Sequence, residues 1–131
     1  MLLSRRAVNY VRPDVCLCGG ITGSKKIAAL AEARSVGVVP HNPLGPISTA
    51  ACLQIAACIP NFALQEYPLG ENQPPKCDFV KEVLKRDGGY LVIPSKPGIG
   101  IELDMAGLAK HPYKPRLMKT RLHEDGSVFD Q

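Results

Sequence analysis

Three titratable side chains, Asp14, His41 and Glu66, each stand at or near the end of a short apolar run. An imidazole and two carboxyl groups are side chains with which proteins transfer protons. The intervals, 27 residues from Asp14 to His41 and 25 from His41 to Glu66, approach the roughly 30 residues of a βαβ unit. Because α/β proteins place their chemistry at the carboxyl ends of parallel strands, this spacing predicts a stretch of parallel sheet that carries part of an active site.

Each of these residues also has a simpler explanation. A lone histidine in a proline-rich loop is usually a capping or surface residue, and an aspartate after a strand commonly caps a turn. Glu66 could equally be an ordinary loop carboxylate. His111 and His123 lie closer to the C-terminus, and we expect both to serve the structure. The pattern alone leaves these alternatives open.

The elements that must position these residues follow from hydrophobic periodicity and turn residues. We expect a strand over residues 9–17, although it contains Pro13, and then a helix capped by Thr22 or Ser24 that stops near Gly37. The apolar side of that helix is expected to comprise Ile27, Leu30 and Ala31.

A second strand and a second helix follow the first pair. Val38 and Val39 are expected to form a buried strand, and Pro46 to lie in the first turn of a helix over residues 47–58. That helix is apolar on nearly every side, so we expect both of its faces to be covered. A third strand is expected at residues 62–64, which completes a βαβαβ run and favours a parallel sheet.

Beyond Pro68 the pattern changes. The expected elements are a short helix over 78–85, an edge strand or hairpin arm over 88–94, a tight turn over 97–100, a helix capped by Asp104 that runs through Ala109, and a polar segment over 113–131 that wraps a surface. We therefore divide the chain into a partial barrel, residues 1–68, and a C-terminal extension that packs back on it, residues 69–131. Three strands cannot close a barrel that needs eight, so a partner must supply the rest or the chain is part of a longer protein, which we favour.

Composition narrows the classes of function. The net charge of +4 is mild, and the only locally basic stretch, residues 110–121, lacks the base-stacking aromatic residues of a nucleic-acid site. No apolar run reaches 18 residues, so we expect no membrane span. The five cysteines show no zinc spacing, and Cys52 and Cys58 fall in an apolar helical run. We expect structural thiols in a reducing, cytoplasmic setting.

Six stretches resemble the C-terminal end of the enolase superfamily, in its mandelate racemase/muconate lactonizing branch and among sugar-acid dehydratases of the D-galactonate dehydratase kind. The stretches are RPDVCLCGGIT (12–22), AALAEA (28–33), VPHNPLGP (39–46), NFALQE (61–66), PGIGIE (97–102) and HEDGS (123–127). They occur in family order and with family spacing, and they are specific jointly. The resemblance implies an α/β fold: strands six to eight of a TIM-type (β/α)7β barrel with their helices, followed by a C-terminal extension.

The resemblance also implies roles for the three residues. His41 matches the general base that removes the proton α to the substrate carboxylate, and Asp14 matches the residue that hydrogen-bonds this base. Such a carboxylate holds the imidazole in one tautomer and stabilises its protonated form. Glu66 matches a position near the substrate carboxylate and the developing enolate, where it could donate a hydrogen bond only when protonated. His41 and Glu66 are therefore the expected substrate-binding residues.

The family pattern is incomplete in this sequence. Its Mg²⁺ ligands are expected on the third to fifth strands and its general acid on the third, and none of these strands is present, so we expect no metal ligand here. The expected function is the C-terminal part of a Mg²⁺-dependent sugar-acid dehydratase that is inactive alone, with a small sugar acid as ligand, no nucleic acid or membrane as partner, and a homo-oligomer or a missing barrel half as the protein partner. The alternatives are a non-catalytic remnant or interaction module, and a racemase or cycloisomerase of the same superfamily.

Overall fold

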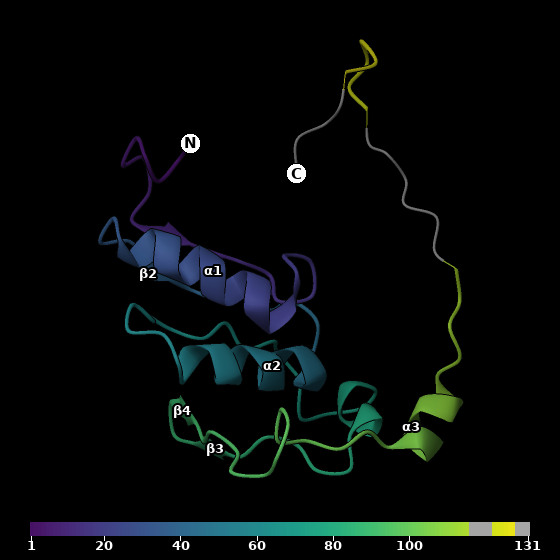
Figure 1. Ribbon diagram of the computed structural model, residues 1–131. Coiled ribbons are helices and arrows are strands. Elements are labelled where there is room, and N and C mark those ends of the chain that lie inside the picture. Colours follow the sequence, from purple (N-terminus) through teal and green to yellow (C-terminus); the bar gives the residue numbers. More distant parts are fainter. Residues whose placement is uncertain (116–121, 128–131) are drawn as a thin grey trace.

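The computed structural model describes residues 1–115 and 122–127 (Figure 1). The elements are, in chain order, β1 (Tyr10–Val11), α1 (Gly20–Glu32), β2 (Gly37–Val38), α2 (Pro46–Ala56), the 3-10 helix η1 (Lys76–Phe79), β3 (Arg86–Asp87), β4 (Tyr90–Leu91) and α3 (Met105–Lys110). Helix α1 lies along α2, and the β3–β4 hairpin lies on the other side of α2. The surface-wrapping segment expected over 113–131 falls outside the described residues at 116–121 and 128–131.

Three parallel segments form a small sheet with β2 in its centre. Strand β1 pairs in parallel with β2, Tyr10 opposite Gly37 and Val11 opposite Val38. On the other side of β2, residues 61–63 add a third parallel segment, because the Val38 N–H donates to the Asn61 carbonyl at 2.8 Å and the Ala63 N–H donates to the Val38 carbonyl at 2.9 Å. The expected parallel order of the three segments is therefore present, although no barrel closes within the described residues.

Pro13 explains why β1 is shorter than the strand expected over residues 9–17. The Val39 N–H donates to the Val11 carbonyl at 3.0 Å, and the His41 N–H donates to the Pro13 carbonyl at 3.0 Å. Between these two bonds a parallel ladder needs an N–H from residue 13, which proline lacks. The ladder is interrupted there and resumes as a single bridge between Asp14 and His41.

Helix α1 begins and ends differently from the expectation. Gly19 precedes it with φ of 93°, which glycine adopts without strain, whereas Thr22 and Ser24 lie inside the helix and cap nothing. The chain reverses at Ser35, with φ of 56°, and not at Gly37. Gly37 has another role, since a Cβ there would lie 2.8 Å from the Tyr10 ring and would displace it.

The buried side of α1 consists of small residues. Ser24, Ala28 and Ala31 follow helical spacing and pack towards the sheet. Leu30 stands two residues beyond Ala28, about 200° around the helix, and is 64% exposed. The expectation that Leu30 belongs to the apolar side was therefore wrong.

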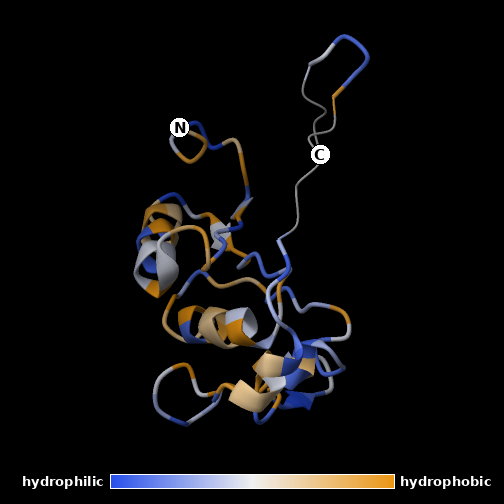
Figure 2. Cartoon of the chain, turned by 90° about the vertical axis from the view of Figure 1, so that its right-hand side faces the viewer, coloured by the Kyte–Doolittle hydropathy of each residue, from blue (hydrophilic) through white to orange (hydrophobic). Residues whose placement is uncertain are grey.

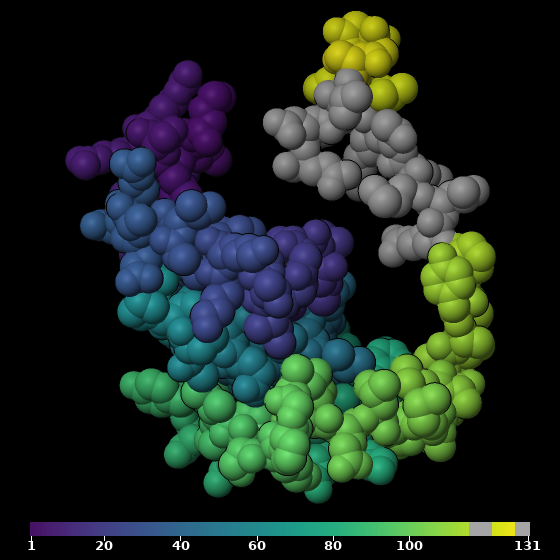
Figure 3. Space-filling model, in the orientation of Figure 1, coloured from purple at the N-terminus to yellow at the C-terminus, as the bar shows by residue number. Residues whose placement is uncertain are grey.

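Helix α2 is covered on both sides, as its apolar composition predicts (Figure 2). Cys52 and Ile55 pack with Val15, which continues from β1. On its other side α2 contributes to a second cluster, which comprises Ala50, Leu53 and Leu84 with Leu91, Ile99 and Ile101 packed against it. The C-terminal half of the chain thus supplies the second cover, visible as the green band in Figure 3.

The C-terminal half agrees with the sequence in its hairpin, in the turn over 97–100 and in α3. The helix expected over 78–85 is replaced by η1, which ends at Phe79. The hairpin of β3 and β4 is present. Helix α3 is capped as expected, since a carboxylate oxygen of Asp104 accepts hydrogen bonds from two backbone N–H groups of the first turn. In the described part of the chain, each helix is too short or too polar to cross a membrane.

Candidate active site

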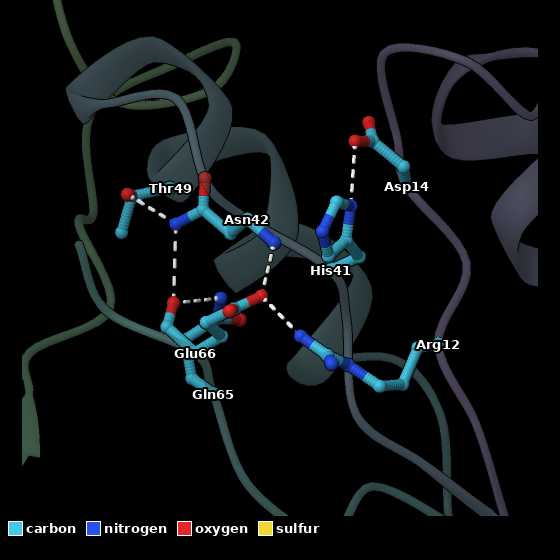
Figure 4. Close-up of polar contacts among 7 residues, drawn as sticks. All are labelled: Arg12, Asp14, His41, Asn42, Thr49, Gln65 and Glu66. Atoms are coloured by element: carbon cyan, nitrogen blue, oxygen red, sulfur yellow. Dashed lines mark hydrogen bonds and ion pairs between the residues drawn. The ribbon is translucent and has the colours of Figure 1, made fainter. Parts of the chain in front are cut away.

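Asp14 and His41 are opposite each other in the parallel sheet, so their side chains project from the same face. His41 Nδ1 lies 2.9 Å from Asp14 Oδ2 (Figure 4). Their contact is therefore a direct result of the pairing of the two segments. The structure brings together the imidazole and the carboxylate that the sequence singled out.

The contact determines which nitrogen of His41 carries the proton. An ionised carboxylate only accepts hydrogen bonds, so Nδ1 is the donor and the lone pair of the neutral ring is on Nε2. Asp14 is itself held, because its Oδ1 accepts a hydrogen bond from the Cys16 N–H at 2.8 Å. The side chain of Asp14 is 10% exposed and that of His41 is 37% exposed. Asp14 therefore also caps the turn that follows its strand, which is the simpler role that the sequence left open.

Glu66 lies at the same rim and is held by two donors. Its Oε2 accepts hydrogen bonds from the Asn42 N–H at 2.7 Å and from the Arg12 guanidinium at 2.7 Å. The Asn42 N–H and, after it, the Arg12 guanidinium lower the pKa of Glu66 below its ordinary value, while desolvation acts in the opposite direction. Glu66 is therefore an ionised acceptor at neutral pH, which disfavours a role as a hydrogen-bond donor.

Arg12 is a residue that the sequence reasoning missed. It precedes Asp14 by two residues, and side chains two apart on a strand share a face. Arg12 directly follows β1, and its guanidinium forms an ion pair with Glu66, which follows the third segment. The ion pair therefore crosses over the middle strand of the sheet (Figure 4). The strand period of two, applied around Asp14, was the signal that could have found it.

Asn42 and Thr49 are two further residues that were missed. Both are fully buried. Asn42 Nδ2 donates to the Glu66 carbonyl at 3.1 Å and to Thr49 Oγ1 at 2.6 Å. Because a carbonyl oxygen only accepts, the amide nitrogen of Asn42 must face Glu66. Polar residues in the first turn of an otherwise apolar helix and in the loop before it were the available signal.

The other two histidines lie away from this rim. His111 Nε2 lies 2.9 Å from Asp78 Oδ2, and its ring packs edge-on against Phe79. The contact ties the end of α3 to η1. The backbone of His123 closes a turn with Gly126 and Ser127. These contacts are structural in kind.

The cysteines divide by environment. All five are free thiols. Cys52 is fully buried in the core, and this burial raises its pKa to about 11. Cys58, which the sequence placed in the same apolar helix, instead lies exposed in the turn beyond α2.

The residues of this rim do not fit a divalent cation. Within residues 1–115 and 122–127, no three histidine, cysteine, aspartate or glutamate side chains converge as metal ligands do. Asp14 is engaged by His41 and a backbone N–H, and Glu66 is engaged by Arg12 and Asn42. The described residues offer an acid–base pair and an ionised carboxylate, and no metal centre.

Comparison with known proteins shows the family of the chain. The sequence pattern of the enolase C-terminal domain-like family matches residues 1–107. The chain belongs to this family. A D-galactonate dehydratase of Cronobacter sakazakii is 46% identical over 136 residues, which cover 98% of this chain and 36% of that protein.

Two solved structures are similar throughout the chain. An enolase-superfamily structure from Agrobacterium radiobacter, with Na and L-malate bound, has a TM-score of 0.83 at 33% identity and is matched over 97% of this chain and 35% of its own. An enolase from Pantoea ananatis, with D-gluconate and Mg bound, has a TM-score of 0.83 at 30% identity, over 98% of this chain and 31% of its own.

The family membership defines what the chain is part of. The chain spans about a third of the length of the relatives it matches. It corresponds to part of a galactonate-dehydratase-like protein of the enolase superfamily, and its fold is similar to part of the barrel-like C-terminal domain of that superfamily. The division at residue 68 and the catalytic roles of Asp14, His41 and Glu66 stay predictions.

Proposed function

We propose that this chain supplies the base-bearing part of a sugar-acid dehydratase. His41 Nε2 takes the proton from the carbon α to the substrate carboxylate, and Asp14 holds the proton on Nδ1. The hydrogen bond of 2.9 Å between these two side chains carries the proposal, because it leaves Nε2 as the basic nitrogen. The β-hydroxyl then takes a proton from an acid outside the described residues and leaves as water, which gives an enol that tautomerises to a 2-keto-3-deoxy acid.

Glu66 has a supporting place in this proposal. It is ionised and paired with Arg12, so the pair presents no net charge to an incoming substrate carboxylate. The free N–H groups of the Arg12 guanidinium, whose side chain is 53% exposed, remain available to acceptor oxygens of a sugar acid. The named activities of the relatives, D-galactonate dehydratases, support a sugar acid as the substrate.

In this proposal the dehydratase reaction depends on Mg²⁺ that is bound by the longer protein of which this chain is a part. One solved relative holds Mg together with D-gluconate. Mg²⁺ stabilises the negative charge that develops on a carboxylate when an α-proton leaves. Since the residues described here do not fit Mg²⁺, the proposal takes its ligands from outside the described residues, and we expect the 131-residue chain alone to be inactive.

A chimera tests the proposal. The matching third of the Cronobacter sakazakii relative is replaced by this chain, and purified chimera is incubated with a panel of aldonic and aldaric acids and Mg²⁺ in D₂O. Nuclear magnetic resonance reports both deuterium at the α-carbon and the keto-deoxy product. We expect His41→Asn to lower turnover by about 10²–10⁴-fold, the usual effect of removing a general base.

His111→Asn is the matched control, because His111 contacts Asp78 far from the rim, and its loss should leave turnover unchanged. A folded, active chimera that His41→Asn does not slow would refute the role of His41. Exchange or racemisation without water loss would identify the superfamily's other reactions. A folded chimera with neither reaction would favour a non-catalytic role.

A further inference from the structure

Glu71 is a buried carboxyl group that the proposed chemistry does not use. It lies in the turn after Pro68, and only 2% of its surface is exposed. Within the described residues, no lysine, arginine or histidine forms an ion pair with it. Burying an unpaired carboxylate is costly, and the usual outcome is that the group stays protonated.

A count of protons around Thr49 agrees with a neutral Glu71. Thr49 Oγ1 is 2.6 Å from Asn42 Nδ2, 3.1 Å from the Gly45 carbonyl, and in direct contact with the Glu71 carboxyl group. The amide of Asn42 can only donate, and the carbonyl of Gly45 can only accept. With the single hydroxyl proton directed at Gly45, a protonated Glu71 donates to Thr49, and all three contacts become hydrogen bonds.

The contacts then continue to the candidate active site. Asn42 links Thr49 to Glu66, because its side chain donates to the Glu66 carbonyl and its backbone N–H donates to the Glu66 carboxylate. Asn42 also directly follows His41. A change at Glu71 would therefore reach the rim through two fully buried side chains, those of Thr49 and Asn42.

We propose that Glu71 is a positioning residue that remains a neutral carboxylic acid and, through Thr49 and Asn42, holds Glu66 beside His41. This inference rests on the proposed function only in its claim that the position of Glu66 matters for catalysis. The hydrogen-bond arrangement itself can be tested on this chain without any turnover, so failure of one does not imply failure of the other.

The burial of Glu71 favours a neutral acid, and the charge that faces it does not cancel this effect. Burial raises the pKa of Glu71, and the positive charge of Lys76 and any hydrogen bond that Thr49 donates to the ionised carboxylate oppose this rise. The Lys76 ammonium donates to the Leu69 carbonyl at 3.2 Å and not to Glu71. Among the described residues, Tyr67 also faces Glu71, and its pKa is raised by burial first and by an ionised Glu71 second.

The sign of the pH dependence follows. The pKa of Glu71 in the folded chain lies above its ordinary value, so the unfolded chain releases this proton at a lower pH than the folded chain does. The contribution of Glu71 to stability is therefore full below its ordinary pKa of 4.5 and is lost as the pH rises through the raised pKa of the folded chain. Glu71→Gln, which is neutral at every pH, should remove this loss.

The test is a titration of the chain labelled with ¹³C in its glutamate carboxyl groups, with Glu71 assigned from Glu71→Gln. We expect the Glu71 signal to keep the shift of a neutral acid above the pH at which the Glu66 signal has already moved. Glu66 is the internal comparison, because its pKa is displaced in the opposite direction. A Glu71 signal that titrates together with that of Glu66 would overturn the proposal.

Two variants separate positioning from mere filling of space. Glu71→Leu keeps the volume and removes the donor, and Thr49→Val removes the hydroxyl. Both should raise the pKa of Glu66 by about half a unit, a threefold rise in proton affinity, whereas Glu71→Gln should leave it unchanged. An unchanged Glu66 titration in folded Glu71→Leu would refute the positioning role. If both variants unfold, the titration of the unsubstituted chain and the dependence of the stability of Glu71→Gln on pH still test whether Glu71 is a neutral acid. A Glu71 that is ionised together with Glu66 would then refute the proposal.

Discussion

His41 and His111 contact their aspartates through opposite ring nitrogens, which makes the two imidazoles an internal pair for comparison. His41 uses Nδ1 towards Asp14, and His111 uses Nε2 towards Asp78. We expect ¹⁵N spectra above the titration range to show the proton of His41 on Nδ1 and that of His111 on Nε2, since a carboxylate fixes the tautomer by accepting.

Asp14→Asn should mix the tautomers of His41 and leave those of His111 unchanged, because an amide offers both a donor and an acceptor. A spectrum of the unsubstituted chain in which His41 carries its proton on Nε2 would contradict the arrangement at the rim.

Arg12 offers a second prediction at the residue scale. The carboxylate of Glu66 contributes stability above its ordinary pKa of 4.5, and this contribution is lost as the pH falls through the lowered pKa of the folded state. Arg12→Gln should raise the pKa of Glu66 only part of the way to the ordinary value, because the Asn42 N–H remains. The cost in unfolding free energy should stay below about 1 kcal/mol, as is usual for an exposed ion pair.

Lys96→Gln is the control for Arg12→Gln, since it breaks the exposed ion pair with Glu82 at 2.7 Å. It should leave the titration of Glu66 unchanged. If Arg12→Gln also left that titration unchanged, the ion pair across the sheet would have no influence on the site.

The expectation that functional residues lie at the carboxyl ends of parallel strands identified Asp14, His41 and Glu66 in the sequence, because each follows an apolar run. It did not find Arg12, Asn42 or Thr49, since each of these depends on which residue lies opposite in the folded chain. Glu71 was out of reach for the same reason, because a glutamate in a loop is ordinarily exposed. Burial of such a residue depends on what packs over it, which the local sequence does not state.

At the scale of elements, Gly23 shows why α1 can lie close to the turn that holds Asp14. A Cβ at this position would lie 2.0 Å from the Cys18 carbonyl. Replacing a helical glycine with alanine ordinarily stabilises a helix by up to about 1 kcal/mol. We expect Gly23→Ala instead to lower the unfolding free energy by about 1–3 kcal/mol, since overpacking must displace the turn.

Ala29→Gly is the comparison for Gly23→Ala, as Ala29 is exposed on the same helix. It should cost about 1 kcal/mol through helix propensity alone. Denaturant unfolding would measure both variants. A stabilised Gly23→Ala would show that the close approach of α1 and the turn is not required.

Cys52 and Cys58 give a second prediction at this scale. The buried Cys52, with a pKa of about 11, should resist alkylation at pH 8, whereas the exposed Cys58 should react readily. Mass spectrometry after a short exposure to iodoacetamide would measure both. Labelling of Cys52 at the rate of Cys58 in the native state would contradict the packing of α2, and denaturant should make the two rates equal.

Helical composition predicted the double cover of α2, because an apolar helix must be enclosed. The cap of α1 could not be predicted in the same way. Thr22 and Ser24 are good capping residues, yet the backbone reverses at Gly19, where positive φ is accessible. The shortening of β1 was visible in principle, since Pro13 lacks the N–H that the ladder needs.

At the scale of the whole molecule, the sheet ends in two unpaired edges within the described residues. Phe62 of the third segment is 37% exposed, and Leu64, which directly follows this segment, is 56% exposed. Tyr10 of β1 is 58% exposed. Exposed apolar strand edges promote association. We expect the sedimentation coefficient of the chain to rise with concentration.

Leu64→Lys should weaken this association about tenfold, an effect of about 1.4 kcal/mol. Leu69→Lys is the matched control, because Leu69 is 97% exposed in a loop beyond the sheet and should change little. A chain that sediments as a monomer at every concentration would contradict the prediction. The sequence anticipated this incompleteness by arithmetic alone, since three strands do not close a barrel.

The pairing of Asp14 with His41 across neighbouring strands has a consequence for how such proteins can diverge. Their relative position is fixed by backbone bonds such as that from the His41 N–H to the Pro13 carbonyl, and α1 intervenes in the chain without intervening in space. Insertions and deletions between residues 19 and 36 can therefore accumulate among homologues while the acid–base geometry is preserved. A single residue gained or lost within either strand would turn one partner to the opposite face and separate the two.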